Sequence, residues 1–288
     1  IEVALAVSGA DKVNAVGWCV GGTILSSALA VMRTRGEESV ASLTLLTTML
    51  DFRDPGDLAV FIDEEGVAKR EQTIGQGGIY PGSELGFVFQ TMRANDLIWP
   101  NVIKNYLKGQ SPEAFDLLYW NADATNLPGP MYAWYLRNMY FENNLRVPGK
   151  LTMCGTQVDL GAIDMPSYVL AAQEDHIVPW RSAYRTTQLV GGKTQFVLGA
   201  SGHIAGVINP ASKNKRSYWA GGQQGDDAEQ WLNGATETPG SWWNHWIKWL
   251  SPNAGKAVAA RRKLGSKKYP LIESAPGRYV KVRASQPK

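Results

Sequence analysis

The stretch Lys12–Thr23, which reads KVNAVGWCVGGT, decides the fold. Its first part, Lys12–Trp18, is a short apolar run rich in valine, and this pattern predicts a buried strand. Apolar side chains then recur at helical spacing over Val20–Arg35, which predicts an α-helix. Cys19 therefore lies on a sharp turn between a strand and a helix.

The residues around Cys19 predict a reactive thiol. Gly17 and Gly21 flank it two residues away on each side, which is the G-x-S-x-G nucleophile-elbow pattern with cysteine in place of serine. Glycines suit this strained turn because neighbouring Cβ atoms would clash, and the pair Gly21-Gly22 is expected to let the helix approach the sheet. The start of the helix favours a thiolate, and the backbone N–H of Val20 is the expected oxyanion donor. The alternative is a buried structural cysteine beside packing glycines.

Three more segments predict strands of the same sheet. They are Ser42–Leu50, Pro166–Ala172 and Thr194–Leu198, with a helical stretch at Arg181–Leu189 between the last two. Strands that alternate with helices predict a mostly parallel sheet with helices on both faces. Together with the elbow, this order predicts an α/β-hydrolase fold.

A long insertion separates the second and third predicted strands. It covers about Asp51–Ile163 and includes the glycine-rich Gly75–Gly86 and the aromatic, proline-containing Asn121–Tyr140. Such an insertion predicts a cap or lid over the strand ends. We therefore expect a core of residues 1–50 and 164–288 and a cap of residues 51–163, with Gly75–Gly86 as a hinge or disordered loop of a mobile gate.

Chain order in this fold is nucleophile, acid, histidine, which limits the candidates for the acid and the base. Asp175 directly follows the third predicted strand, and His203 follows the fourth in a loop of small residues. Cys19, His203 and Asp175 would then form a complete set of nucleophile, base and orienting acid. His176 could compete as base, contact the substrate or be structural.

Two other candidate residues are assigned to packing. His245 lies in a predicted helix with Trp242, Trp246 and Trp249 at near-helical spacing, and this aromatic face is expected to point into the core. A contact with a partner or a granule is the alternative for that face. Cys154 lacks flanking glycines and is expected to be buried and inert.

Composition excludes several classes of protein. The 288 residues include no apolar stretch of the ~20 residues that a membrane span needs, and no HExxH, CxxC or GxxxxGK motif supports a metal or phosphate-loop site. Two cysteines are too few for a disulfide framework, which fits a reducing cytoplasm. No motif supports nucleic-acid binding.

The charge is uneven along the chain. Residues 253–288 carry ten Lys/Arg against the single acid Glu273, which leaves 19 basic and 25 acidic residues, a net of −6, in residues 1–252. A basic tail on an acidic body could meet an anionic surface or simply be solvated.

Several runs resemble class I polyhydroxyalkanoate synthases over nearly the whole chain. The runs are Gly17–Thr23, Asn121–Pro130, Glu174–Trp180, Gly199–Pro210 and Lys213–Arg216.

The resemblance implies an enzyme that polymerises (R)-3-hydroxyacyl-CoA, typically the 3-hydroxybutyryl unit, and releases CoA. It implies that Cys19 carries the acyl chain as a thioester, that His203 activates Cys19, and that Asp175 supports His203 or helps deprotonate the incoming 3-hydroxyl. The resemblance places Arg137 at the CoA entrance, where a basic side chain would suit the CoA phosphates. His176, beside Asp175, is the other candidate contact with the substrate. A cytoplasmic homodimer on the surface of polymer granules is implied too, with no cofactor, since CoA is the leaving group of the substrate.

Two rival functions remain. A cysteine thioesterase or lactone hydrolase would use the same residues and give free 3-hydroxy acid instead of polymer. A non-catalytic granule-binding protein would use the aromatic helix and the basic tail, and the intact set of Cys19, Asp175 and His203 argues against it.

The sequence also predicts that the N-terminal part of the fold is missing. Only 18 residues precede Cys19, enough for a helical stretch at Ile1–Gly9 and the nucleophile strand. An elbow hydrolase needs an earlier neighbouring strand, so we expect upstream residues to cover the free edge of Val13–Trp18.

Overall fold

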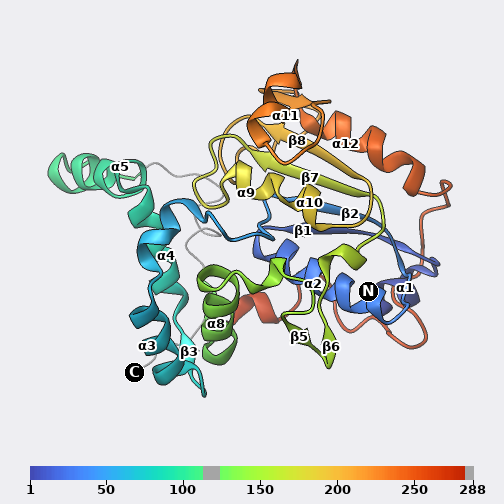
Figure 1. Cartoon of the computed structure of the whole chain (residues 1–288), viewed down its shortest axis with the longest axis horizontal. Coiled ribbons are helices and arrows are strands. Elements are labelled where there is room, and N and C mark those ends of the chain that lie inside the picture. The colour runs from blue at the N-terminus through green and yellow to red at the C-terminus, as the bar shows by residue number, and fades with distance from the viewer. Residues whose placement is uncertain (113–123, 283–288) are drawn as a thin grey trace.

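The computed structural model describes residues 1–112 and 124–282 (Figure 1). Its centre is a six-stranded sheet in the order β1-β2-β7-β8-β9-β10. The first four of these strands are parallel, and the last two are antiparallel. The strands are β1 (Val13–Trp18), β2 (Val40–Leu46), β7 (Ser167–Ala172), β8 (Thr194–Gly199), β9 (Ser217–Ala220) and β10 (Thr236–Pro239).

The parallel strands are where the sequence predicts them, and their burial explains their composition. Every residue of β7 is buried, because strands inside a parallel sheet are covered on both faces and so need continuous apolar runs. β2 ends earlier than expected, at Leu46, because Thr47 turns the chain with a φ of 42°. Within the described residues β1 pairs with β2 alone, so it is an edge strand.

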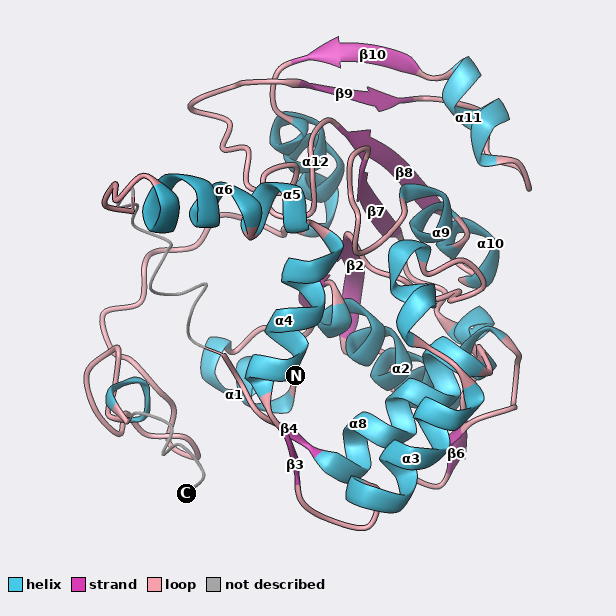
Figure 2. Ribbon diagram, turned by 90° about the vertical axis from the view of Figure 1, so that its left-hand side faces the viewer, coloured by secondary structure: helices cyan, strands magenta, loops and turns pink. Residues whose placement is uncertain are grey.

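Helices cover both faces of the sheet, and successive residues of β7 point to opposite faces. Val169 packs into a large cluster with side chains from several helices, while Tyr168 packs into a smaller cluster under a single helix (Figure 2). The several helices include α2 (Val20–Thr34), α9 (Trp180–Tyr184), α10 (Thr186–Leu189) and α11 (Ala228–Gly234), and the single helix is α12 (Trp242–Leu250).

The aromatic face of α12 points inward, as the sequence predicts. Trp242 is buried and its indole N–H donates to the Gly206 carbonyl at 3.0 Å. The Trp246 indole N–H donates to Thr44 Oγ1 at 3.0 Å. His245 lies 3.1 Å from the Tyr168 hydroxyl, which confirms it as a packing residue of this helix.

Among the described residues between β2 and β7, the helices α3, α4 and α5 lie to the left of the sheet in Figure 1, and β5 and β6 lie below it. Residues 75–86 form a turn after α3, then β3 and the first residues of α4, so the expectation of a disordered loop there is wrong, while a hinge at this place stays a prediction. The elements are η1 (Gly56–Phe61), α3 (Glu64–Ile74), β3 (Ile79–Tyr80), α4 (Gly82–Met92), α5 (Ala94–Leu97), α6 (Trp99–Asn101), η2 (Val102–Leu107), β4 (Leu127–Pro128), α8 (Gly129–Tyr135), η3 (Leu136–Phe141), η4 (Asn144–Arg146), β5 (Thr152–Met153), β6 (Thr156–Gln157) and η5 (Leu160–Ala162).

The division into core and cap, and gating by the cap, remain predictions. Of the sequence run Asn121–Pro130, the residues Asn121–Asp123 lie outside the described part of the chain.

The remaining elements are α1 (Glu2–Ser8), η6 (Ser251–Asn253) and η7 (Tyr279–Lys281). No helix among the described residues is long and apolar enough to cross a membrane.

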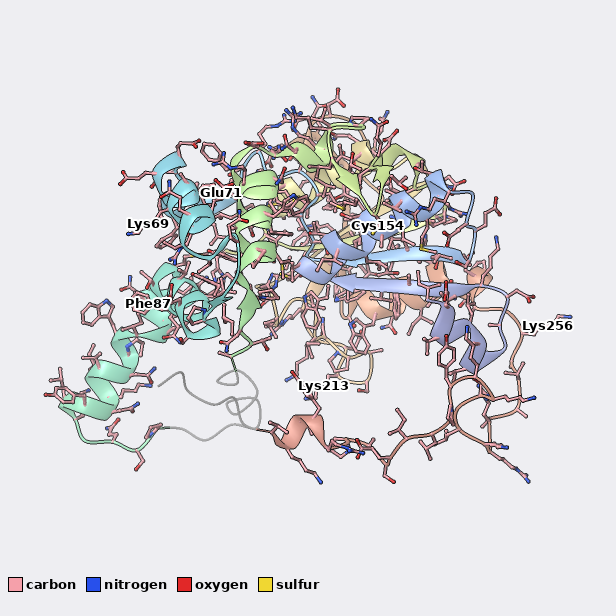
Figure 3. The ribbon with its side chains drawn as sticks, turned by 90° about the horizontal axis from the view of Figure 1, so that it is seen from below. Lys69, Glu71, Phe87, Cys154, Lys213 and Lys256 are labelled. Carbon is pink, nitrogen blue, oxygen red and sulfur yellow. The ribbon has the colours of Figure 1, made fainter. Side chains whose placement is uncertain are left out.

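Two expectations need correction. The helical stretch Arg181–Leu189 is two short helices, α9 and α10, that meet at Arg185. Cys154 is exposed, not buried, because it occupies the tight turn between β5 and β6 with a φ of 52° (Figure 3). Its backbone carbonyl accepts a hydrogen bond from the Arg35 guanidinium.

Candidate active site

Cys19 forms the strained turn that the sequence predicts. It follows β1 directly, precedes the first residue of α2, and has φ 54° and ψ −129°. Its N–H donates to the Leu46 carbonyl at 2.9 Å, and its carbonyl accepts from the Gly22 N–H at 2.9 Å. A non-glycine residue at positive φ is costly, so these hydrogen bonds hold the thiol at the end of the sheet.

Close packing requires glycine at positions 17 and 22. The sequence suggests the pair Gly21-Gly22. A Cβ on Gly17 would come within 2.5 Å of Gly22 Cα, and a Cβ on Gly22 within 2.0 Å of Thr48 Oγ1. A Cβ on Gly21 would meet nothing within 4 Å. Helix α2 therefore approaches β1 and the end of β2 through Gly17 and Gly22, and Gly21 is not a packing requirement.

Asp175 turns one carboxylate oxygen toward the backbone and the other toward His203. It lies just after β7, and its Oδ1 accepts from the backbone N–H groups of Ile177 and Val178, both at 2.9 Å. Its Oδ2 lies 2.7 Å from Nδ1 of His203. The carboxylate has no exposed side-chain surface, so these hydrogen bonds fix its position and aim it at the imidazole.

His203 is buried in the loop after β8, with 7% of its surface exposed. Burial by itself lowers its pKa, but the hydrogen bonds to Asp175 and Cys19 and the charges of both groups outweigh burial and raise the pKa to about 9. The elbow and the loops after β7 and β8 thus bring Cys19, His203 and Asp175 together. This arrangement can move a proton between a thiol and an imidazole whose other nitrogen is held by a carboxylate.

Val20 is the first residue of α2, and helix geometry leaves the N–H of a first residue without an intrahelical acceptor. This N–H adjoins the Cys19 turn, where an oxyanion donor is needed. Its role remains a prediction.

Three aromatic side chains near Cys19 were not found from the sequence. The rings of Tyr135 and Tyr140 are 6.0 Å apart, and Phe52 packs edge-on against both, at 6.1 Å and 4.8 Å. Burial raises the pKa of Tyr135 and of Tyr140, and Cys19 adds to the rise in both. The two tyrosines are five residues apart and face the same side because η3 is a π-helix, which periodicity in the sequence does not reveal.

His176 lies near Asp175 and His203 and also near the guanidinium of Arg93. Burial lowers its pKa first, the nearby Arg93 lowers it further, and Asp175 opposes both. Arg93 follows α4 and donates to Asp96 Oδ2 at 2.7 Å. A substrate contact by His176 stays a prediction, and Arg93 is a neighbour that the sequence did not single out.

Arg137 is held in a cluster of acids. Its guanidinium donates to both carboxylate oxygens of Glu71, at 2.5 Å and 2.8 Å, and lies 3.2 Å from Glu64 and 3.2 Å from Glu142. The hydrogen bond to Glu71 is the largest cause of its raised pKa. With three carboxylates around it, Arg137 joins η3 to α3 and is not an open anion site, so the expected contact with CoA phosphates does not fit this arrangement.

No group of three or more His, Cys, Asp or Glu side chains within the described ranges is arranged to hold a metal ion.

The class of protein follows from comparison with known families. A family model described as the alpha/beta hydrolase fold matches residues 1–210, which is more than half of the chain. The chain therefore belongs to the α/β-hydrolase family, as the parallel sheet and the elbow indicate.

Individual relatives give a more specific similarity than the family model does. The chain is 56% identical to the poly(3-hydroxyalkanoate) polymerase subunit PhaC of Cupriavidus necator, over 99% of this chain and 49% of the relative. It is 44% identical to the protein of the same name from Rhizobium meliloti, over 99% of this chain and 46% of the relative. A poly(3-hydroxyalkanoate) polymerase 1 of Ectopseudomonas oleovorans is 38% identical, over 98% of this chain and 50% of the relative.

These matches confirm the resemblance to polyhydroxyalkanoate synthases that the sequence motifs indicate. The chain spans about half the length of the curated relatives it matches.

Proposed function

We propose that this chain is the catalytic part of a polyhydroxyalkanoate synthase, an acyltransferase that polymerises (R)-3-hydroxyacyl-CoA and releases CoA. The observation that carries the proposal is the buried Asp175–His203 pair, 2.7 Å between Oδ2 and Nδ1, beside a cysteine on a nucleophile elbow. Similarity to named polymerases over nearly the whole chain supports this activity over others that the fold hosts.

Acylation uses Cys19 as nucleophile. His203 takes the thiol proton, and the sulfur attacks the thioester carbonyl carbon of the substrate. The carbonyl oxygen gains the negative charge, which the Val20 N–H stabilises. When the carbonyl re-forms, the bond to the CoA sulfur breaks, and CoA leaves with the proton held by His203. The products are an acyl-Cys19 thioester and free CoA.

Chain growth uses the same base. The 3-hydroxyl of a second hydroxyacyl-CoA gives its proton to His203 and attacks the acyl-Cys19 carbonyl carbon. An ester bond forms, the bond to the Cys19 sulfur breaks, and the sulfur recovers the proton from His203. The lengthened acyl-CoA then returns to Cys19 by the acylation step.

For Asp175 we propose the orienting role and not deprotonation of the 3-hydroxyl. Both of its oxygens are already bound, one by the N–H groups of Ile177 and Val178 and the other by His203. The carboxylate also has no exposed surface through which a hydroxyl could approach. It fixes the imidazole tautomer and stabilises the imidazolium in both steps.

Exclusion of water separates a polymerase from a thioesterase on this site. Phe52, Tyr135 and Tyr140 place three aromatic rings around the neighbourhood of Cys19, and apolar walls of this kind limit hydrolysis of the acyl-enzyme. In the proposed enzyme the segment 51–163 acts as the cap that supplies this wall. CoA is a leaving group here, and we propose no cofactor.

The 3-hydroxybutyryl unit as the preferred substrate, a homodimer, and a cytoplasmic location on polymer granules belong to the same proposal and rest on the resemblance alone.

One assay tests the proposal. The purified protein is given (R)-3-hydroxybutyryl-CoA, and CoA release is followed together with turbidity from insoluble polymer. We expect both signals, their loss in Cys19→Ala, and their retention in the matched variant Cys154→Ala, whose sulfur is exposed on a turn away from the pair. CoA release that yields only soluble 3-hydroxy acid would establish the thioesterase instead.

A further inference from the structure

The chain after α12 has a composition and an exposure unlike the rest of the molecule. We call residues 254–282 the C-terminal segment. It follows η6 near the edge strand β1, where the Asn14 side chain donates to the Asn253 carbonyl at 2.9 Å. Beyond that point it runs away from the sheet, with short local turns and the single helical turn η7 (Figures 1 and 3).

The C-terminal segment carries a concentrated positive charge. It holds eight basic residues against the one acid Glu273, a net of +7. Among the residues that the structure describes, Arg278 alone of the eight has an acidic partner within 4 Å, Glu273 at 3.3 Å. The eight are Lys256, Arg261, Arg262, Lys263, Lys267, Lys268, Arg278 and Lys281. Lys256 extends away from the protein (Figure 3).

Apolar side chains are interspersed with these cations, and both kinds are exposed. Ile272 is 85% exposed and Val258 88% exposed, and such side chains are normally buried when a fold offers them a surface. The large apolar side chains left in solvent are Val258, Leu264, Leu271, Ile272, Tyr279, Val280 and Val282. One short segment therefore presents both positive charge and apolar surface.

We propose that the C-terminal segment binds an anionic lipid surface. Lysine and arginine side chains gain energy near negatively charged headgroups, and neighbouring apolar side chains enter the interface between headgroups and acyl chains. Residues 1–252 carry a net charge of −6, so the net positive charge of the chain is concentrated in its C-terminal part. The protein would bind with its C-terminal segment toward the lipid and its body toward water.

The two kinds of side chain distinguish lipid from other partners. Nucleic acid would pair with the cations but leave Leu271, Ile272 and Val258 in water. A neutral polyester would cover the apolar side chains but give no partner to the cations. An anionic lipid surface satisfies both.

The test measures binding of the whole chain to vesicles. Vesicles of one part phosphatidylglycerol to three parts phosphatidylcholine are compared with vesicles of phosphatidylcholine alone, by co-sedimentation at low and high salt. We expect binding to the anionic vesicles only, weakened by salt. Since each basic residue near an anionic membrane contributes about 1 kcal/mol, Arg261→Gln, Arg262→Gln and Lys263→Gln together are expected to weaken binding about a hundredfold.

A control variant removes the same charge elsewhere. Lys69→Gln, Lys104→Gln and Lys108→Gln neutralise three exposed lysines of residues 51–163 and are expected to leave vesicle binding within about twofold of the parent. A second variant, Leu271→Ser with Ile272→Ser, keeps the charge and removes apolar surface, and we expect it also to weaken binding. Circular dichroism checks that each variant is folded.

Three results would overturn the inference: equal binding to neutral vesicles, equal loss in the control variant, or tighter binding to duplex DNA or to polyester particles than to anionic vesicles. The inference does not depend on the proposed activity. CoA release measured without vesicles should be unchanged in all three variants, so loss of lipid binding and failure of the polymerase assignment give different results.

Discussion

The proposed catalytic pair, Asp175 and His203, and the Arg137 cluster show two ways in which this molecule uses opposite charges. Asp175 and His203 are both buried, and Oδ2 of Asp175 lies in hydrogen-bonding distance of Nδ1 of His203. Around Arg137, three carboxylates that are 37% to 65% exposed share one guanidinium. The first arrangement shifts the pKa of a single imidazole in a site beside a thiol, while the second ties two helices together. Replacing a residue of the buried pair should therefore alter activity, and replacing a residue of the exposed cluster should not.

The largest loss of activity is expected when the proposed base, His203, is replaced. His203→Gln should lower kcat for CoA release by roughly 10²–10⁴-fold, because general base catalysis contributes about that much. His245→Gln, a histidine of the packed helix α12, is the control and should keep nearly full activity. If the two variants lost activity equally, the distinction between a catalytic and a packing histidine would fail.

Replacement of Asp175 should alter both activity and pH dependence. The hydrogen bonds and charges of Asp175 and Cys19 outweigh burial and raise the pKa of His203 to about 9, above the ordinary value of 6.5. The folded protein therefore holds this proton more tightly than the unfolded chain, and the stabilisation is complete below pH 6.5 and lost as pH rises through 9.

In Asp175→Asn the part of this pH-dependent stability that is due to Asp175 should disappear, and the His203 pKa should fall. Urea unfolding of parent and variant at about pH 6 and about pH 9.5 measures the first, and NMR titration of the His203 ring the second. An unchanged His203 pKa would contradict the orienting role. Loss of chain growth with normal acylation would instead assign Asp175 to the 3-hydroxyl.

The packing of the elbow predicts opposite results for two neighbouring glycines. Gly22→Ala should destabilise the protein by about 1–3 kcal/mol, since its Cβ would overlap the Thr48 side chain. Gly21→Ala meets nothing within 4 Å and should be neutral or stabilising by about 0.5 kcal/mol. Thermal and urea unfolding of the pair give the comparison, and equal destabilisation would show that the turn does not pack as described.

The smallest effect is expected in the Arg137 cluster. Arg137→Gln should cost about 1 kcal/mol of stability and leave the KM for the acyl-CoA within about twofold, because partly exposed ion pairs contribute little. Glu71→Gln, which removes the main partner, should have a similar effect on stability. A large rise in KM for Arg137→Gln alone would restore the contact with CoA that the sequence suggested.

The sequence predicts the parallel strands and the three residues at their ends because strand order and burial leave direct patterns. Cys19, Asp175 and His203 each follow a predicted strand, and parallel strands end at one edge of a sheet. The tyrosines near Cys19 were missed because their common orientation depends on a π-helical turn. Cys154 was misplaced because the residues around it do not show that β5 and β6 form a surface hairpin.

Trapping of the acyl-enzyme tests the central claim most directly. The protein is mixed with (R)-3-hydroxybutyryl-CoA, quenched in acid within the first turnovers, digested, and examined by mass spectrometry. We predict a 3-hydroxybutyryl thioester on the peptide that contains Cys19, an unmodified Cys154, and a stronger signal when His203 is intact than in His203→Gln. Acyl groups on another residue, or CoA release with no acyl group on Cys19, would contradict the account.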